Sequence, residues 1–203
     1  MTMRPLLTLS YFPNYTSLRM ESVHPTIRLP LMKFSGQIFY IRTFDAVEKA
    51  ATKLLQILQE MMQIAIGFDI EWKPTFRKGV PPGKVAVMQI YGDTRHCHVG
   101  AGIDGDAVKV FRDYNISVKG VTDLSFHANR KLGGDHKWGL ASLTEKLLSK
   151  QLKKPNKIRL GNWETPVLSK EQLEYAATDA FASWYLYQKV TDRSGEVDGV
   201  PQE

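Results

Sequence analysis

Two carboxylates stand two residues apart at the end of an apolar run, in the stretch QIAIGFDIEWKPTF at residues 63–76. Side chains alternate along a β-strand, so Asp69 and Glu71 point to the same face of the predicted strand. Two negative charges side by side repel each other and lose hydration, and a cation is therefore expected opposite them. One interpretation is that the pair binds a metal ion. The other is that nearby basic side chains neutralise it at a solvated sheet edge: Lys73, Arg77 or Lys84.

A tyrosine and an aspartate on a late predicted helix form a second candidate pair. Tyr175 and Asp179 are four residues apart, so they share one helix face about a turn apart. The alanines around them let a sheet, another backbone or a ligand approach closely. The pattern is compatible with a chemical site. It is equally compatible with a helix that packs through its alanines, with Tyr175 as an anchor and Asp179 in an ion pair.

The stretch GAGIDG, Gly100–Gly105, satisfies the G-x-G-x-x-G pattern of dinucleotide-binding loops, and Asp123 follows about twenty residues later. We do not expect dinucleotide binding, because the strands before this stretch are predicted to be antiparallel and no second βαβ half follows. Asp104 and Asp106 instead place carboxylates at the start of a predicted helix, where the helix dipole favours negative charge. The histidines form no zinc-binding pattern, and no phosphate-binding loop of the G-x-x-x-x-G-K-[ST] type occurs.

Length and composition indicate one globular domain with tails. The 203 residues are 43% apolar and 24% charged, and no apolar run approaches the ~18 residues that span a bilayer, so no membrane partner is expected. The single cysteine allows no internal disulfide, which favours a reducing compartment. We expect a flexible leader over residues 1–33, a folded domain over 34–190 and a flexible tail over 191–203. The acid-free start of the chain keeps an organellar location open beside a cytoplasmic one.

The net charge of +6 is concentrated in one part of the chain. Between Lys119 and Arg159 there are ten Lys or Arg residues and three acids, a local excess of 10 − 3 = +7. Such a segment suits a polyanion such as nucleic acid, although a basic face that is merely solvated has the same composition.

Hydrophobic periodicity predicts the elements that must position these residues. Strands are expected over residues 36–42, 65–72, 85–92 and 95–99. The last three of these strands should form an antiparallel meander whose first strand carries the acid pair. Helices are expected over residues 43–63, 106–114, 122–132, 139–152 and 169–190. Ser169 and Gln172 form a capping box at the start of the last helix, and the whole predicts a mixed α/β or α+β domain.

The acids and the tyrosine resemble, in their order along the chain, the DEDDy pattern of 3′–5′ exonucleases: Asp69 and Glu71 on a strand, Asp106 at a helix start, Tyr175 and Asp179 on a late helix. The stretches GFDIEWKPTF, GIDGDAVKVFRDY and EYAATDAFASWYLY are similar to those of the Werner-like exonucleases within the ribonuclease-D-like group. This group includes the exonuclease domain of the Werner syndrome protein and its stand-alone plant version, to which the similarity is greater. The resemblance extends from Phe34 to Val190.

The resemblance implies the RNase H-like exonuclease fold and metal-dependent hydrolysis of phosphodiester bonds at nucleic-acid 3′ ends, with release of nucleoside monophosphates. It implies two divalent cations, Mg²⁺ or Mn²⁺, bound by the catalytic acids Asp69, Glu71, Asp106 and Asp179. Tyr175 would orient the attacking water or the scissile phosphate, since a phenol of pKa ~10 is a poor base at neutral pH. The resemblance also implies DNA as the partner, with RNA as an alternative, a separate helicase or repair protein, and a nuclear location.

Basic and aromatic side chains are the candidates for contact with nucleic acid. The basic ones are expected to follow the sugar-phosphate backbone without reading sequence: Lys137, Lys153, Lys154 and Arg159. Trp72 and Phe76 lie close in sequence to the acid pair and are candidates for stacking on terminal bases, with ordinary packing as the alternative.

The chain departs from the family pattern at one point. In the family, the strand that corresponds to residues 95–99 is followed by a helix and another strand before the glycine-rich turn, whereas here Val99 runs directly into Gly100. We expect either the loss of a core strand and its covering helix, or that the strand at 95–99 leaves its neighbour at 85–92 and reaches across the sheet. Either route threatens the position of Asp106. The alternative function is therefore a catalytically impaired nucleic-acid-binding module.

Overall fold

A computed structural model describes residues 28–60, 65–93 and 97–191 of the chain. Within these residues, four strands form one mixed sheet in the order β2-β1-β3-β4. The strands are β1 (Ala65–Trp72), β2 (Val85–Asp93), β3 (Cys97–Gly100) and β4 (Val121–Asp123). The helices are α1 (Phe44–Glu60), α2 (Ile103–Tyr114), α3 (Leu124–Leu132), α4 (Leu140–Leu148), α5 (Asn156–Arg159) and α6 (Lys170–Thr191). The predicted mixed α/β class is confirmed.

The central strand of the sheet is β1, and its apolar residues form the middle of the core. Ala65, Phe68 and Ile70 are at most 3% exposed. β2 pairs with β1 antiparallel, β3 pairs with β1 parallel, and β4 pairs with β3 parallel. A strand that has neighbours on both sides and is buried on both faces reads as a nearly continuous apolar run, and this explains why the stretch AIGFDIEW predicts β1 correctly.

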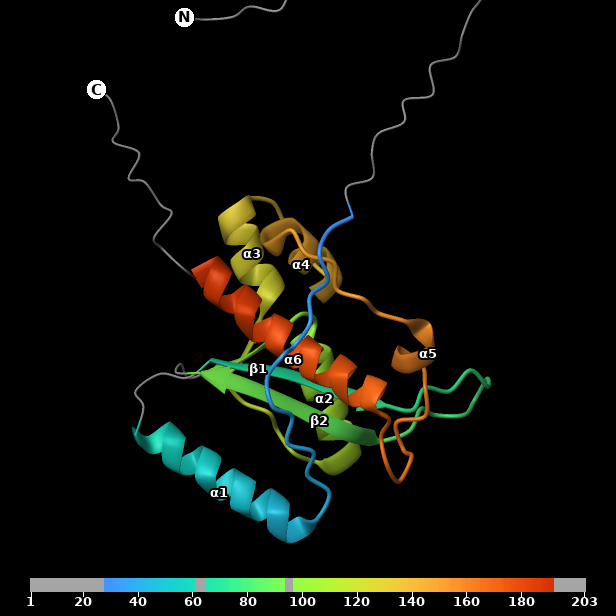
Figure 1. Ribbon diagram of the computed structural model, residues 1–203. Coiled ribbons are helices and arrows are strands. Elements are labelled where there is room, and N and C mark those ends of the chain that lie inside the picture. Colours follow the sequence, from blue (N-terminus) through green and yellow to red (C-terminus); the bar gives the residue numbers. More distant parts are fainter. Residues whose placement is uncertain (1–27, 61–64, 94–96, 192–203) are drawn as a thin grey trace, which may run out of the picture.

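Helix α6 covers one face of the sheet and α2 the other (Figure 1). α6 can approach β1 closely because Gly67 has no side chain: a Cβ atom there would lie 1.9 Å from the carbonyl oxygen of Ala180. On the opposite face, Ile103 and Val110 of α2 pack with Phe68 and other apolar residues of the sheet. The central strand is therefore packed between two helices, and this packing fixes the position of the side chains at its end.

A second apolar cluster joins α3 and α4 to α6. Leu124, Leu143 and Leu186 of this cluster are fully buried. Met32 belongs to the same cluster, and its N–H donates a hydrogen bond of 2.9 Å to the carbonyl of Gln151. The folded part thus begins a few residues before the predicted boundary at 34. The predicted leader up to residue 27 and the predicted tail from residue 192 lie outside the described residues.

The capping box predicted at the start of α6 is confirmed. The backbone N–H of Gln172 donates to Oγ of Ser169 at 3.2 Å, and the N–H of Ser169 donates to Oε1 of Gln172 at 3.0 Å. Two backbone donors that the helix itself leaves unpaired are satisfied in this way. The start of α6, and with it the position of each residue on the helix surface, is set by this local signal.

The predicted antiparallel meander is wrong, because β3 pairs with β1 and not with β2. Asp93 at the end of β2 and Cys97 at the start of β3 are both paired with Ala65, so the chain passes from one flank of β1 to the other at a single end of the sheet. Since β2 and β3 run in opposite directions, this step needs no long crossover. The second of the two routes expected after the internal shortening is the one that the structure adopts.

Residues 36–42, expected as a strand, are not a strand in the structure. Phe39 within them is 75% exposed. β-Branched and aromatic residues favour an extended chain, but a strand also needs a neighbouring edge to bond, and these residues bond to none of the described strands. The tertiary pairing, not the local preference, decides the outcome. The following helix is present as α1, while residues 61–64 of the expected helical stretch lie outside the described residues.

Two short elements in the second half of the chain were not predicted, β4 and α5. Asp123 ends β4 and caps α3: its carboxylate accepts from the N–H groups of Gly102 and Ser125, each at 2.7 Å. This aspartate therefore joins the loop before α2 to the start of α3. That structural role agrees with the rejection of a dinucleotide-binding loop. None of the helices in the described part of the chain is long and apolar enough to cross a membrane.

Candidate active site

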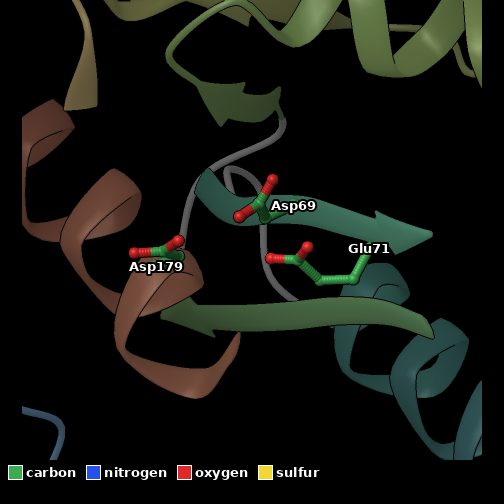
Figure 2. Close-up of side chains that lie close together, drawn as sticks. All are labelled: Asp69, Glu71 and Asp179. Carbon is green, nitrogen blue, oxygen red and sulfur yellow. The ribbon is translucent and has the colours of Figure 1, made fainter. Parts of the chain in front are cut away.

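Three carboxylates converge where β1 faces α6. Asp69 and Glu71 come from β1 and Asp179 from α6, and their side chains lie close together (Figure 2). Each offers one oxygen to a common position, since these oxygens all lie within 4.8 Å of one another. Glu71 is 8% exposed and Asp179 only 1%. The fold thus brings together the strand pair and the helix acid that were predicted separately.

The local sequence of β1 sets the depth of this site. Alternation places Gly67, Asp69 and Glu71 on the face that α6 covers. α6 contacts the backbone of β1 where the carbonyl of Ala180 meets Gly67. Asp179 precedes Ala180 on α6, and it therefore lies beside Asp69, the first acid after Gly67 on β1. One glycine therefore positions the third carboxylate against the first two.

Burial and mutual repulsion make these acids weak. Burial, and after it the charge of Asp179, raises the pKa of Asp69 to about 8. Burial, and after it the charge of Asp69, raises the pKa of Glu71 to about 9. Burial also raises the pKa of Asp179 above its ordinary value. The raised pKa values of Asp69 and Glu71 mean that these two acids favour their protonated forms at neutral pH, and added positive charge would favour the ionised forms.

Lys154 supplies part of that positive charge. Its ammonium donates a hydrogen bond of 2.6 Å to Oδ2 of Asp179 and lies 5.5 Å from the centre of the Tyr175 ring. The charge of Lys154 opposes the rise in the pKa of each acid of the site. The neighbouring lysines expected at the sheet edge are engaged elsewhere, Lys73 with Glu164 at 3.8 Å and Lys84 above the Tyr114 ring at 5.6 Å.

The residues of the site fit a divalent cation. Oδ1 of Asp179 is buried and has no hydrogen-bond partner among the described residues, so one carboxylate oxygen lacks a positive or donor group. A single lysine offsets at most one of the three negative charges. Carboxylate oxygens are hard ligands of the kind that Mg²⁺ and Mn²⁺ prefer. Of the two interpretations open for the acid pair, coordination of a metal ion is the better supported.

Asp106 lies near the cluster but is not one of its three members. It occupies the first turn of α2, and its charge contributes to the raised pKa of Asp69 and of Glu71. Burial raises the pKa of Asp106 itself to about 7, against the opposing charge of Lys154. β3 delivers α2 to this place because it runs parallel to β1 and ends beside it, with Gly100 against the backbone of Phe68. Asp106, the fourth predicted acid, therefore lies within electrostatic range of Asp69 and Glu71.

Tyr175 stands on α6 one turn before Asp179 and is 8% exposed. Burial, together with the negative charges of Asp179, Glu71 and Asp69, raises the pKa of Tyr175 far above that of a free phenol. The hydroxyl is therefore neutral at any physiological pH. It can donate and accept hydrogen bonds but cannot remove a proton from water, as the sequence suggested.

The two aromatic candidates for base stacking lie in different surroundings. Trp72 is on the opposite face of β1 from the acids, packs against the core under α2, and has the ammonium of Lys109 5.1 Å from its ring centre. Phe76 is 79% exposed on the loop after β1. The structure does not bring Trp72 together with the acids. The stacking role predicted for Phe76 stays a prediction.

The basic candidates other than Lys154 lie in different parts of the structure. Lys153 lines a hollow of about 320 Å³ that also has Tyr175 and Asp179 in its wall. Lys137 lines a larger hollow of about 590 Å³ beside α3, whose wall includes Asp123. Arg159 is exposed on α5 and bonds to Asn156 at 3.2 Å. Contact of these three residues with nucleic acid remains a prediction.

Sequence reasoning missed two features of the site. Lys154 was expected at the nucleic-acid surface, and nothing in the local sequence indicated that it would bond to Asp179. Residues 31–34, expected at the boundary of a flexible leader, form part of the wall of the smaller hollow, and the N–H of Phe34 donates to Thr178 Oγ1 at 3.2 Å. Both features depend on contacts between distant segments, which periodicity does not report.

The site combines two acids on the central strand of a mixed sheet with a tyrosine and an aspartate on α6. The chain belongs to the 3′-5′ exonuclease family, whose sequence profile matches residues 84–194. It is 50% identical over 198 residues to a 3′-5′ exonuclease of Arabidopsis thaliana, an alignment that covers 84% of this chain and 69% of the relative. The protein is thus a hydrolase that acts on nucleic acids.

Two further similarities agree with this assignment. The bifunctional 3′-5′ exonuclease/ATP-dependent helicase WRN of Mus musculus is 30% identical over 187 residues, which is 80% of this chain and 13% of that protein. The crystal structure of RNase D from Escherichia coli has a TM-score of 0.52 at 19% identity and covers 75% of this chain and 43% of that one. The structural likeness supports the fold. The chain spans only a small part of the mouse relative.

Proposed function

We propose that this protein hydrolyses phosphodiester bonds at the 3′ ends of nucleic acids with two divalent cations, Mg²⁺ or Mn²⁺, and releases nucleoside monophosphates. The observation that carries the proposal is the convergence of three carboxylate oxygens within 4.8 Å, with one buried oxygen of Asp179 that has no partner in the described part of the chain. Asp69, Glu71 and Asp179 would hold one cation, and Asp106 would help to hold the other.

Divalent cations at such a site supply an activated water and stabilise charge on the leaving oxygen. The side chains of this chain supply the positioning. The neutral hydroxyl of Tyr175 can orient the attacking water or the scissile phosphate, since it faces the same acids. Lys154, which is 29% exposed in its side chain, is placed to offset the negative charge of an incoming phosphate.

The hollow of about 320 Å³ beside Asp179 is where we place the 3′-terminal nucleotide. Its wall is formed by residues of α6, by apolar residues such as Met32, and by the basic Lys33 and Lys153. The wall also contains Glu171 and Glu174. Its apolar side chains suit a base, and its two lysines suit a phosphate. The other basic residues, including Lys137 and Arg159, would follow the remaining strand through its phosphates.

DNA is the substrate that we propose, with RNA as the alternative. A nuclear location and cooperation with a separate helicase are part of the proposal, and the helicase activity in the name of the relative WRN supports the helicase partner. The internal shortening after Val99 is also a proposal. It is supported by the alignment to the plant relative, which extends over 198 residues while covering 84% of this chain.

The second candidate function is nucleic-acid binding without efficient cleavage. It is favoured by Asp106, which lies outside the group of three acids and whose displacement by about 1 Å would suffice to slow catalysis. Both functions use the basic residues proposed to contact nucleic acid, and they differ only in whether the bound strand is cleaved.

The test uses a 5′-labelled recessed DNA duplex, with Mg²⁺, with Mn²⁺ or with EDTA, and the isosteric variant Asp69→Asn as control. A cation-dependent ladder that shortens from the 3′ end, absent in the control, establishes the exonuclease. Salt-sensitive binding by both proteins without any ladder would favour the binding module. If the protein neither binds nor cleaves the duplex, both functions are rejected for DNA, and the test moves to RNA.

A further inference from the structure

Gln89 lies in the middle of β2, directly opposite Asp69 of β1. The residue is 8% exposed. Both polar atoms of its amide, Oε1 and Nε2, are buried and have no hydrogen-bond partner among the described residues. A buried amide without partners is unfavourable, because it has given up its bonds to water and gained none in return. The presence of such a group in the folded protein therefore calls for a physical explanation.

The sheet register places Gln89 beside the acid cluster. Opposite residues on an antiparallel pair point to the same face, so Gln89 shares with Asp69 and Glu71 the face covered by α6. Opposite Cβ atoms are about 4.5–5.5 Å apart, and the glutamine chain is long enough to reach either carboxylate. Its neighbours on the same face of β2 are engaged in packing, Val87 against the Trp163 cluster and Tyr91 against aromatic rings.

The burial of the amide also decides which kind of partner it can have. Both of its polar atoms are covered by protein, so a substrate arriving from solvent cannot bond to them. The carboxylates of Asp69 and Glu71 lie on the same face of the sheet and within reach of the amide. A carboxylate has two oxygens, so one that binds a cation through one oxygen can still accept a hydrogen bond at the other. The N–H groups of an amide are the complement of that second oxygen.

We propose that Gln89 is a positioning residue for the cation site: in the cation-bound state its amide donates to the Glu71 carboxylate and holds it in the binding orientation. The inference rests on the proposed function, because it concerns the cations that the same acids bind. The amide gains its partner only when the cation is present. Gln89 therefore favours the bound state over the free one.

The test measures Mn²⁺ binding to the full chain by isothermal titration calorimetry, and thermal unfolding in EDTA, for wild type and Gln89→Met. Methionine keeps the length and volume but cannot form the hydrogen bond. We expect binding of Mn²⁺ to weaken about tenfold or more, as for other residues that support metal ligands. Without cation, the variant should unfold at the same temperature as wild type or higher, because an unsatisfied polar group has been replaced by an apolar one.

The matched control is Gln172→Met, a glutamine of similar burial that satisfies the capping box of α6. It should lower the unfolding temperature and leave the affinity of the folded protein for Mn²⁺ within twofold. Gln89→Asn, which retains the amide but shortens its reach, should bind Mn²⁺ as weakly as Gln89→Met, and it serves as the second variant if the first is poorly folded.

Unchanged Mn²⁺ affinity in both Gln89 variants would overturn the inference while leaving the proposed function intact. A Gln89→Met protein that unfolds at a lower temperature in EDTA and binds Mn²⁺ normally would show Gln89 to be a packing residue only. Wild-type protein that binds no Mn²⁺ would reject the proposed cation site itself, and the inference with it.

Discussion

The ammonium of Lys154 donates a 2.6 Å hydrogen bond to Oδ2 of Asp179, a carboxylate that is 1% exposed, while the other oxygen of the same carboxylate has no partner among the described residues. One aspartate thus has one oxygen that accepts from a lysine and a second oxygen that is free to bind a cation. The lysine offsets part of the negative charge of the cluster, and a divalent cation would offset the rest.

Replacing Lys154 by methionine should destabilise the protein. The variant removes the ammonium donor from a buried carboxylate, and the loss should be about 1–3 kcal/mol in the free energy of unfolding, limited because Asp179 can take up a proton. Urea unfolding in EDTA measures it. The control is Lys153→Met, whose side chain is exposed and whose removal should change stability by less than about 0.5 kcal/mol. Equal losses in the two variants would mean that the bond to Asp179 contributes nothing.

Stability should fall as the pH rises when divalent cations are absent. The pKa values of Asp69, Glu71 and Asp106 are raised to about 8, 9 and 7, from ordinary values of 3.8, 4.5 and 3.8. The folded state therefore binds more protons than the unfolded state between about pH 4 and 9, and the free energy of unfolding decreases with pH across this window.

Thermal unfolding at pH 6 and pH 9 in EDTA measures this decrease. Saturating Mg²⁺ should remove or reverse it, because cations bind the ionised acids. The double variant Asp69→Asn, Glu71→Gln should lose most of the dependence. A wild-type protein more stable at pH 9 than at pH 6 in EDTA would contradict the prediction.

Adding a methyl group at Gly67 should separate the acids. A Cβ atom there would lie 1.9 Å from the carbonyl oxygen of Ala180 and 2.9 Å from the backbone nitrogen of Trp184, so α6 must move away from β1. We expect Gly67→Ala to cost about 1–3 kcal/mol and to weaken Mn²⁺ binding, because Asp179 moves with the helix. Gly105→Ala in α2, where a Cβ meets no atom within 4 Å, should instead stabilise by about 0.5–1 kcal/mol. Unaltered Mn²⁺ affinity in Gly67→Ala would show that α6 can move away from β1 without displacing Asp179 from the other acids.

Two residues paired across β1 and β2 should differ sharply in their contribution to stability. Phe68 and Ile90 are partners in the register, yet Phe68 is 3% exposed and Ile90 is 48% exposed, because α2 covers β1 but leaves part of β2 open. Phe68→Ala should cost about 3–5 kcal/mol, and Ile90→Ala about 1 kcal/mol or less. Urea unfolding compares them. A large loss for Ile90→Ala would mean that another segment covers β2 in solution.

Local signals predicted the parts of this protein that depend on neighbouring residues. The apolar run with acids two residues apart predicted β1 and the shared face of Asp69 and Glu71. The spacing of Tyr175 and Asp179, together with the capping box at Ser169, predicted α6 and the side-by-side position of those two residues. Each of these features follows from strand alternation, helix periodicity or a hydrogen bond between residues three apart, and all three are confirmed in the structure.

Other features were decided only by contacts between distant segments. The stretch at 36–42 has the composition of a strand but no edge to bond to, and β3 lies beside β1 although its sequence is equally suited to pairing with β2. The side chain of Trp72 lies on the face of β1 away from the acids, whereas the ammonium of Lys154 bonds to one of them. Composition and spacing describe which conformations a segment prefers, and they do not say which partner it meets.

By itself, the sequence determined the elements that carry the acids, the order of those elements along the chain and the membership of the exonuclease family. Tertiary structure alone decided how deep Asp179 lies, which lysine bonds to it, and that Gln89 is enclosed beside the acids with no partner among the residues that the structure describes. The physical reason is that burial and electrostatic interaction depend on distances in space. The packing of α6 on Gly67 and the position of β3 beside β1 set those distances.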